Sequence, residues 1–460
     1  MKLRDWQANC IDTALKFYQT ERHFLCSATP AAGKTIMSAM LAKQLKDNNL
    51  IDYVLCFSPS TAVTENMRDT FSNVLNARFD GVIGSVGNSH TYQSIKGLKD
   101  DYINLLNEYR ILVVFDEIHH CAGNSDSTAN AWGKGILKKL KDKAIYTLSL
   151  SGTPWRSDNL PITLAEYENQ INCHYLYGLT EAIQDGVCRS PQIVLIDNKN
   201  IKITKENDEV QTFPSFVDLF NQKVISYSEL VHNKKALKYI LNQAINKLDN
   251  IRCNQLNAGG LIVASSTIHA YMISELMKKE FNQNSIVVTY KNPNAITIIN
   301  DFKNSHESWI ISVGMISEGT DIPRLQVCCH LSRVKTELYF RQVLGRILRV
   351  TSGSDEKAWL YTFAEPSLSD FSYRLQEEIP KQSIVNEIDT DFEYLNTESE
   401  PSNKTKSRSY IPSLELDFDN QSSKLNINSY AYSNDGRVMT MDLHGSFREK
   451  IIATFNSLPY

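Results

Sequence analysis

Residues 28–35 have the sequence Ala28-Thr29-Pro30-Ala31-Ala32-Gly33-Lys34-Thr35. The apolar run Phe24-Leu25-Cys26 before this stretch predicts a buried strand, and the apolar spacing over residues 36–41 predicts a helix after it. A tight loop of small residues between a strand and a helix start is typical of a phosphate-binding loop, because backbone N–H groups there point at anionic oxygens. In such a loop Lys34 reaches the β- and γ-phosphates and the Thr35 hydroxyl holds Mg²⁺.

This motif is imperfect, because Ala28 stands where the general pattern has its first glycine. The alternative is an ordinary loop of small residues in front of an α/β helix. The assignment of a nucleotide site therefore depends on finding other motifs in the rest of the chain.

The composition is that of an ordinary globular protein, with 460 residues, 42% hydrophobic and 22% charged. The first five residues lack an apolar signal core and no run approaches a membrane span, so we expect a cytoplasmic protein without a membrane segment. The 9 cysteines include no C-x-x-C pair, and we expect them to be reduced and buried. A net charge of −4 excludes a nucleic-acid binder that works through bulk charge, so any nucleic acid is expected in a local groove.

Short apolar runs alternate with helical patterns and predict parallel sheets covered by helices. We expect residues 1–165 to form one α/β lobe, residues 166–380 a second, and residues 381–460 a polar linker with a small C-terminal appendage. Amphipathic helices between about residues 200 and 256 are expected to pack onto the second lobe. The predicted strands are Phe24–Ala28, Tyr53–Phe57, Ile111–Phe115, Ile145–Leu150, Ile193–Ile196, Leu261–Ala264, Ile286–Thr289, Trp309–Val313, Val327–Leu331 and Trp359–Phe363.

A pair of carboxylates follows the apolar run Ile111–Phe115, in the sequence Asp116-Glu117-Ile118-His119-His120. The carboxyl end of a buried strand is where ligands bind in open α/β sheets. Asp116 suits the shell of Mg²⁺, and Glu117 is then placed to polarise an attacking water. An acidic N-cap of the next helix is the alternative interpretation.

The stretch from Ser149 to Arg156 closes the next strand and contains Ser151-Gly152-Thr153. Small hydroxylated residues at this position can bridge a carboxylate of the nucleotide site to the groove between the lobes. Ser151 and Thr153 are therefore candidates for coupling the nucleotide site to the groove between the lobes. A simple turn is the alternative.

The run Tyr339–Arg349 carries three polar side chains, Gln342, Arg346 and Arg349, at spacings that place them on one face of a helix. Gly345 within a helix is unfavourable relative to Ala by about 1 kcal/mol, so it indicates a close approach to another part of the molecule. Guanidinium groups presented across a cleft are what a developing γ-phosphate charge requires. The alternative is a solvated basic helix face.

Together these stretches resemble the superfamily 2 helicases and translocases of the DExH type. That family has an α/β fold in which two tandem RecA-like lobes clamp ATP and Mg²⁺ between them. The resemblance covers residues 1 to about 375. The matching stretches, in the family's order, are Leu3–Gln7, Ala28–Thr35, Phe57–Ser60, Asp116–His119, Ser151–Thr153, Leu261–Ser266, Gly314–Pro323 and Gln342–Arg349.

The resemblance implies a role for each matching position. Gln7 would hydrogen-bond the adenine base, and Thr35 and Asp116 would hold the metal. The implied catalytic residues are Lys34, Glu117, Gln342, Arg346 and Arg349. The implied nucleotide contacts are Gln7, Ala31, Ala32, Gly33, Lys34, Thr35, Gly319 and Asp321, and the implied nucleic-acid contacts are Ser58, Ser60, Ser265 and Thr320.

Thr91-Tyr92-Gln93, Ser151–Arg156 and Leu179–Gly186 look like the motor subunits of restriction enzymes and related DNA-repair helicases. That resemblance implies a nucleic-acid-dependent ATPase that moves along or unwinds DNA, with RNA as the less favoured substrate. One alternative is the motor subunit of a restriction or phage-defence complex whose nuclease is another chain, with residues 380–460 available to a protein partner. Another is an ATP-gated, protein-binding switch that does not translocate.

Overall fold

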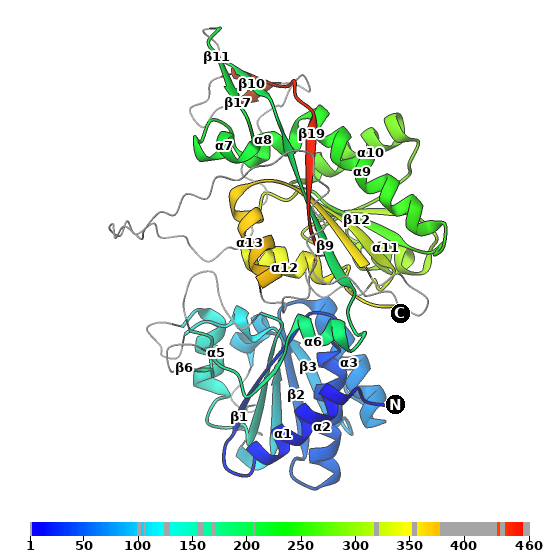
Figure 1. Ribbon diagram of the computed structural model, residues 1–460. Coiled ribbons are helices and arrows are strands. Elements are labelled where there is room, and N and C mark those ends of the chain that lie inside the picture. Colours follow the sequence, from blue (N-terminus) through cyan, green and yellow to red (C-terminus); the bar gives the residue numbers. More distant parts are fainter. Residues whose placement is uncertain are drawn as a thin grey trace, which may run out of the picture.

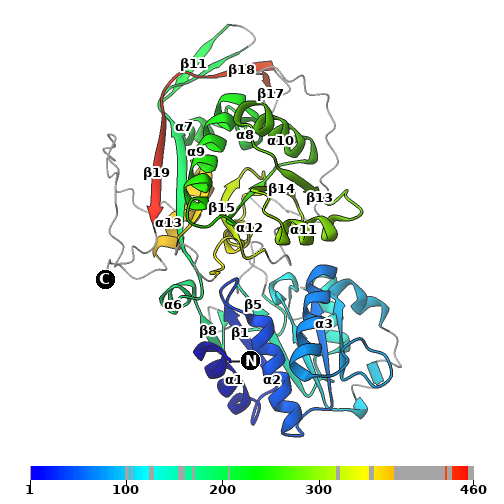
Figure 2. The ribbon, with the colours of Figure 1, turned by 90° about the vertical axis from the view of Figure 1, so that its right-hand side faces the viewer.

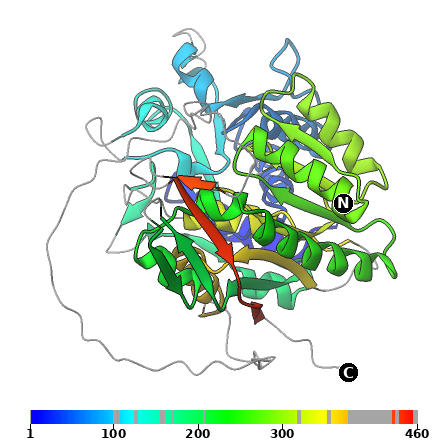
Figure 3. The same ribbon diagram turned by 90° about the horizontal axis from the view of Figure 1, so that it is seen from above.

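The structure is a computed structural model that describes residues 2–98, 103–104, 107–123, 129–153, 161–167, 171–205, 208–316, 322–351, 357–377, 430–432 and 438–453. These residues form two α/β lobes, one stacked on the other, each built on its own main sheet (Figures 1 and 2). Seen from above, the second lobe lies over the first (Figure 3). In the described part of the chain, no helix is long and apolar enough to span a membrane.

The first lobe contains a six-stranded sheet in the order β3-β2-β4-β5-β1-β8, in which all neighbouring strands are parallel. Its strands are β1 His23–Ala28, β2 Tyr53–Ser58, β3 Gly87–Thr91, β4 Ile111–Phe115, β5 Tyr146–Ser151 and β8 Tyr175–Tyr177. Its helices are α1 Asp5–Phe17, α2 Lys34–Asp47, α3 Thr61–Leu75, α5 Ala131–Lys139 and α6 Leu179–Gln184, with short turns of 3-10 helix at η1 Tyr92–Gly97 and η2 Ile118–His120. A two-stranded hairpin pairs β6 Glu166–Tyr167 with β7 Ile171–Asn172.

The second lobe contains a seven-stranded sheet in the order β13-β14-β12-β15-β16-β9-β19, parallel except for β19. Its strands are β9 Ser190–Asn198, β12 Gly259–Val263, β13 Ile286–Thr289, β14 Trp309–Val313, β15 Leu325–His330, β16 Lys357–Phe363 and β19 Phe447–Ala453. Its helices are α7 Phe216–Asn221, α8 Tyr227–His232, α9 Lys234–Arg252, α10 Thr267–Phe281, α11 Ala295–Asn304, α12 Glu337–Gly345 and α13 Pro366–Glu377.

Continuous apolar runs produce these strands, because a parallel strand covered by helices is buried on both faces. Every residue of β4, β12 and β14 is buried. Each of the ten strands predicted from the sequence is present, with ends within a few residues of the prediction. The amphipathic helix α9 packs on β15 and β16, as expected for the segment before residue 256.

The C-terminal strands are built into the second lobe rather than standing apart from it. β18 Val438–Leu443 joins β10 Ile201–Thr204 in a small antiparallel sheet ordered β11-β10-β18-β17, which also contains β11 Val210–Phe213 and β17 Tyr430–Tyr432. β19 pairs with residues 192–198 of β9 and runs beside it in Figure 2. The Phe447 ring stacks on Tyr239 of α9, with ring centroids 4.1 Å apart.

The change from the first sheet to the second differs from the expected boundary at residue 165. β8 pairs with β1, so the first sheet continues to Tyr177, and the second sheet begins with Ser190. The three-residue run of β8 is too short to signal a strand in the sequence. Helix α6 and residues 185–189 therefore form the connection between the two sheets, and they lie where the lobes meet (Figure 1).

Candidate active site

The loop of residues 29–33 joins β1 to α2 and has two residues in the left-handed region of backbone conformation. Gly33 is the N-cap of α2 with φ +97°, a value that glycine adopts without steric cost. Ala31 has φ +70°, which costs an L-residue with a Cβ atom about 1–2 kcal/mol. The loop thus has the sharp shape that a phosphate cradle needs, although an alanine occupies one of its strained positions.

The start of α1 holds this loop in place. The Arg4 guanidinium donates to the Ala32 carbonyl at 2.7 Å, and the Gln7 amide donates to the Gly33 carbonyl at 3.0 Å. Gln7 also accepts from the backbone N–H of Arg4 at 3.0 Å and is buried. Sequence reasoning placed Gln7 at the adenine base and missed Arg4, whose only signal was its place beside Gln7 in the Leu3–Gln7 motif.

Lys34 and Glu117, which stand far apart in the sequence, are brought together at the tips of β1 and β4. The Lys34 ammonium lies 3.7 Å from a Glu117 carboxylate oxygen and donates to the Ala28 carbonyl at 3.0 Å. Both side chains are only partly exposed, 10% for Lys34 and 26% for Glu117. The structure therefore pairs a cation with a carboxylate beside the 29–33 loop, and these are the two kinds of group that a γ-phosphate and its attacking water need.

Glu117 is fixed further by the turn after β5. Its other oxygen accepts from the Gly152 N–H at 3.3 Å and lies 3.4 Å from the His119 ring nitrogen Nδ1. That same nitrogen lies 2.9 Å from the Ser151 hydroxyl oxygen, which also accepts from the Thr153 N–H at 3.1 Å. The structure thus brings the turn of residues 151–153 against Glu117, with the His119 ring in contact with both Glu117 and Ser151.

Asp116 lies beside Glu117 and is buried. Burial and, to a lesser extent, the neighbouring Glu117 charge raise the pKa of its carboxyl to about 7, while Lys34 opposes the rise. Its Oδ1 atom is buried and has no hydrogen-bond partner among the described residues. A buried carboxylate oxygen without a donor fits a divalent cation, and the hydroxyl of Thr35 would add a second oxygen ligand of the kind that Mg²⁺ prefers.

The second lobe reaches this site through the C-terminal end of α12, which lies on the side of the lobe that faces the first lobe (Figure 1). A Cβ atom on Gly345 would lie 2.5 Å from the Pro30 Cβ. On the other side, a Cβ on Gly152 would lie 3.1 Å from the Pro30 Cδ and 3.2 Å from the Lys34 nitrogen. The close approach predicted for Gly345 is confirmed, and Pro30 of the 29–33 loop is the residue that it meets.

The helix predicted to carry all three polar residues is shorter than expected. α12 ends at Gly345, Arg346 is its C-cap, and Arg349 lies in extended backbone that bridges to Cys188. Gln342 lies on α12, whereas Arg349 lies beyond its end. The prediction that one helix face carries all three residues is therefore wrong for Arg349. The physical reason is that the Ile347 and Leu348 carbonyls accept hydrogen bonds from Arg189 instead of continuing the helix.

Cys188, in the connection between the sheets, contacts the 29–33 loop with its thiol 3.6 Å from the Pro30 carbonyl oxygen. Burial raises the pKa of this thiol to about 12, while the positive charges of Arg4, Arg349 and Lys34 oppose the rise. These cations come from α1, from the segment after α12 and from α2. The backbone of Arg349, which bridges to Cys188, therefore lies next to the edge of the loop.

Two family models match this chain. Residues 1–156 match the family described as "Type III restriction enzyme, res subunit", and residues 241–351 match "Helicase conserved C-terminal domain". The first match contains the 29–33 loop and the Asp116-Glu117 pair. The second contains α12 and Arg349. The chain belongs to helicase superfamily 2.

Individual similarities agree with this assignment. An uncharacterised protein of Mycobacterium leprae (strain TN) is 26% identical over 397 residues, which cover 81% of this chain and 64% of that protein. The "DNA 3'-5' translocase XPB2" of Sulfurisphaera tokodaii is 24% identical over 400 residues, covering 81% of this chain and 83% of that protein. The matched part of the chain thus spans just under two thirds of the mycobacterial relative.

Among solved structures, the chain superposes on the fragment structure assigned to an HsdR subunit of a type I restriction enzyme from Vibrio vulnificus YJ016. The TM-score is 0.54 at 17% identity, and the match covers 80% of this chain and 65% of that one. At this identity the likeness shows the fold alone, two RecA-like lobes. The link of this superfamily 2 protein to restriction-enzyme motors is the family match to residues 1–156.

Two of the predicted nucleic-acid contacts of this helicase-family protein are buried. The Ser58 hydroxyl oxygen lies 2.7 Å from that of Thr64, and the Ser265 hydroxyl lies 2.8 Å from the His269 ring. Both hydroxyls are therefore used inside their lobes, which argues against direct contact with nucleic acid. Ser60 caps α3 by accepting from the Val63 N–H. The predicted residues Gly319, Thr320 and Asp321 lie outside the described residues.

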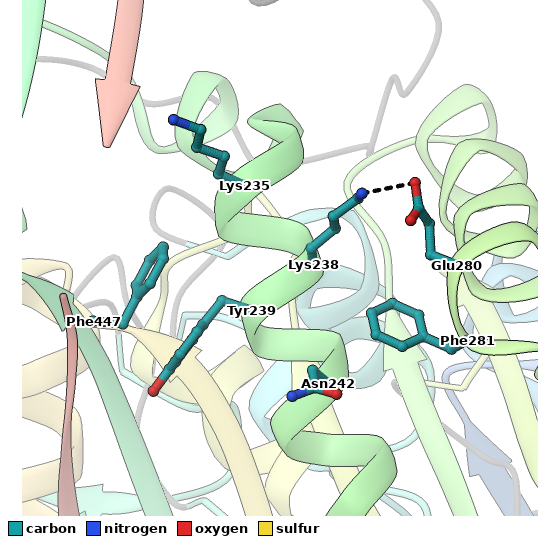
Figure 4. A pocket seen from close by; sticks show the side chains of 7 residues that line it. All are labelled: Lys235, Lys238, Tyr239, Asn242, Glu280, Phe281 and Phe447. Atoms are coloured by element: carbon teal, nitrogen blue, oxygen red, sulfur yellow. Dashed lines mark ion pairs between the residues drawn. The ribbon is translucent and has the colours of Figure 1, made fainter. Parts of the chain in front are cut away.

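A cavity of about 430 Å³ lies on the second lobe between α9, α10 and β19 (Figure 4). Its lining includes the Lys238–Glu280 ion pair at 2.7 Å and the stacked rings of Tyr239 and Phe447. None of its lining residues belongs to the helicase motifs. This cavity is therefore separate from the candidate active site at the 29–33 loop.

Proposed function

We propose that this superfamily 2 protein is a Mg²⁺-dependent and nucleic-acid-dependent ATPase that hydrolyses ATP between its lobes and moves along or unwinds DNA. The observation that carries the proposal is the composite character of the site. Lys34 and Glu117 lie 3.7 Å apart in the first lobe, and Gly345 of the second lobe packs against Pro30 beside them.

In the proposed reaction, Lys34 neutralises the β- and γ-phosphates and Glu117 orients the attacking water. The Thr35 hydroxyl and the Asp116 carboxylate would hold Mg²⁺, which supplies charge neutralisation at the phosphates. The backbone of Ala31, Ala32 and Gly33 would cradle the phosphates, with Gln7 at the base.

The second lobe supplies the remaining catalytic groups in this proposal. Arg346 and Arg349 stabilise the charge that develops on the γ-phosphate, and Gln342 lies on α12, which ends directly before Arg346. Because neither lobe alone carries the complete set, hydrolysis depends on the closure of one lobe against the other.

The Gly152 N–H that donates to Glu117, and the contacts of the His119 ring with Glu117 and Ser151, support a coupling role for Ser151 and Thr153. Loss or gain of charge next to Glu117 alters the hydrogen bonds that its oxygens accept, and those bonds reach the turn of residues 151–153 directly. Such a turn can transmit the state of the nucleotide to the rest of the groove between the lobes.

DNA is the proposed substrate because of the kinship with restriction-enzyme motors in residues 1–156 and with a relative named as a DNA translocase. The same family match favours one alternative, a motor subunit that works with a separate nuclease chain in a restriction or phage-defence complex. In that case the motor chemistry is unchanged, and a partner chain adds the cleavage.

Steady-state ATP hydrolysis in the presence of single-stranded DNA, duplex DNA, forked DNA and RNA tests the proposal. We expect strong stimulation by at least one DNA substrate, weaker stimulation by RNA, and no hydrolysis when Mg²⁺ is chelated. Hydrolysis that no nucleic acid stimulates would contradict the motor function and favour an ATP-gated switch. Copurification with a nuclease would favour the restriction or phage-defence complex.

A further inference from the structure

Arg189 is a buried arginine in the connection between the two sheets, 1% exposed, directly after Cys188 and before the first residue of β9. None of the motifs that match superfamily 2 contains it. Burying a guanidinium is costly unless its N–H groups find acceptors, so the position of those acceptors shows what the residue does.

Two of the acceptors that the described residues offer the Arg189 guanidinium lie on the segment that carries Arg349. The guanidinium donates to the Ile347 carbonyl at 3.1 Å, to the Leu325 carbonyl at 2.9 Å and to the Thr351 hydroxyl at 3.3 Å. Its backbone N–H donates to the Leu348 carbonyl at 2.7 Å. Carbonyls at the end of a helix lack partners within the helix, and here Arg189 supplies them for the residues after α12.

The neighbouring residue connects the same segment to the first lobe. The Cys188 backbone bridges to Arg349, and its thiol contacts the Pro30 carbonyl oxygen at 3.6 Å. Residues 188 and 189 therefore touch the 29–33 loop on one side and the 346–351 segment on the other. A change in the angle between the lobes that moves this connection must also move the backbone of Arg349.

We propose that Arg189 is a positioning residue for the proposed ATPase: it fixes the 346–351 segment so that Arg346 and Arg349 face the nucleotide site. The inference rests on the proposed function of these two arginines. It adds that their placement is set by the connection between the lobes, through Arg189, rather than by helix α12, which has already ended at Gly345.

Arg189→Lys tests the inference because lysine keeps the charge but cannot make the forked set of hydrogen bonds. Arg324→Lys is a matched control in the same lobe. Arg324 is also buried, and its guanidinium donates to the Phe302, Glu307 and Asn257 carbonyls, none of which belongs to the site. We expect the two variants to lose similar thermal stability.

Turnover separates the two variants. Arg189→Lys should lower kcat roughly 10- to 100-fold, the scale expected when catalytic groups are displaced by about an ångström. The KM for ATP and the affinity for a non-hydrolysable ATP analogue should change little, because Lys34 and its loop are untouched. Arg324→Lys should keep kcat near wild type. Equal losses of kcat in both variants, or no loss in Arg189→Lys, would overturn the positioning role.

Hydrogen exchange of the amides of residues 346–351 gives a readout that does not depend on ATP hydrolysis. Faster exchange in Arg189→Lys than in Arg324→Lys is expected, and unchanged exchange would overturn the inference even if the wild type proved inactive toward ATP. If Arg189→Lys does not fold, Thr351→Val removes one acceptor and keeps the shape of the side chain. It should lower kcat in the same direction by a smaller factor, and an unchanged kcat would count against the proposal.

Discussion

Gly345 of the second lobe lies against Pro30 of the 29–33 loop in the first lobe, so closely that a Cβ on Gly345 would lie 2.5 Å from the Pro30 Cβ. The contact joins the end of α12 to the loop that leads into Lys34. Next to it, the Cys188 thiol lies 3.6 Å from the Pro30 carbonyl oxygen. Pro30 is therefore the point at which the two lobes meet beside the proposed phosphate site, and its neighbours set how closely they can approach.

Gly345→Ala should impair hydrolysis without weakening the fold. The added methyl group cannot fit against Pro30 unless the lobes separate, so kcat should fall roughly 10- to 100-fold. Helix α12 should gain up to about 1 kcal/mol, because alanine is the better helix former. Parallel measurement of ATP turnover and thermal unfolding checks both. Gly97→Ala is the control, since a Cβ on Gly97 meets open space; wild-type turnover in Gly345→Ala would show that the contact is not needed.

Lys34→Ala should abolish ATP hydrolysis and leave the fold intact. The Lys34 ammonium contacts the Ala28 carbonyl and Glu117 at the site and packs in no core. Circular dichroism and ATP turnover measure the two effects. The matched control is Lys43→Ala, because Lys43 lies on the same helix, is exposed and pairs with Asp47. Retained turnover in a folded Lys34→Ala protein would remove the 29–33 loop from the mechanism.

Glu117→Gln should still bind ATP and hydrolyse it very slowly. The substitution keeps the shape of the side chain, and the Gly152 N–H can still donate to its amide oxygen, but the group can no longer polarise a water. Equilibrium binding of ATP and single-turnover hydrolysis distinguish the roles. A variant that loses nucleotide affinity yet turns over normally what it binds would identify Glu117 as a metal ligand instead.

Ala31→Gly should leave the thermal stability and the ATP affinity unchanged or raise them, whereas Gly33→Ala should lower both. Ala31 has φ +70°, and glycine would relieve a strain of about 1–2 kcal/mol, partly offset by its greater freedom in the unfolded chain. Gly33 has φ +97°, and a Cβ there would lie 3.0 Å from the Gln7 amide nitrogen. Ala31→Gly should therefore have the higher unfolding temperature and the higher ATP affinity of the two variants. The reverse order would contradict the conformation described for the loop.

The strands and the first-lobe site were predictable from the sequence because their signals are local. Apolar runs mark buried strands, and the loop before Lys34 and the Asp116-Glu117 pair each follow such a run directly. The close approach at Gly345 was predictable, because glycine destabilises a helix relative to alanine and is expected where a larger side chain would not fit. The partner of Gly345 was not, because Pro30 lies in the other lobe.

What the sequence could not reveal depends on contacts between distant residues. The helix pattern of Gln342, Arg346 and Arg349 continues past Gly345, but the chain leaves the helix because Arg189 binds the carbonyls that follow. Periodicity alone carries no information about such a partner. In the same way, Ser58 and Ser265 match the family's motifs, yet Thr64 and His269 bind their hydroxyls in the interior.

The central claim, that one ATPase site is built from both lobes, is tested most directly by single-turnover ATP hydrolysis in Arg349→Ala, compared with equilibrium binding of a non-hydrolysable ATP analogue. The account predicts that hydrolysis falls about 10³-fold or more, the scale found when an arginine finger is removed, while analogue binding changes little because the first lobe holds most of the nucleotide. Arg374→Ala, which removes an exposed arginine paired with Glu337, should hydrolyse ATP normally. Near-normal hydrolysis in Arg349→Ala would contradict the two-lobed active site.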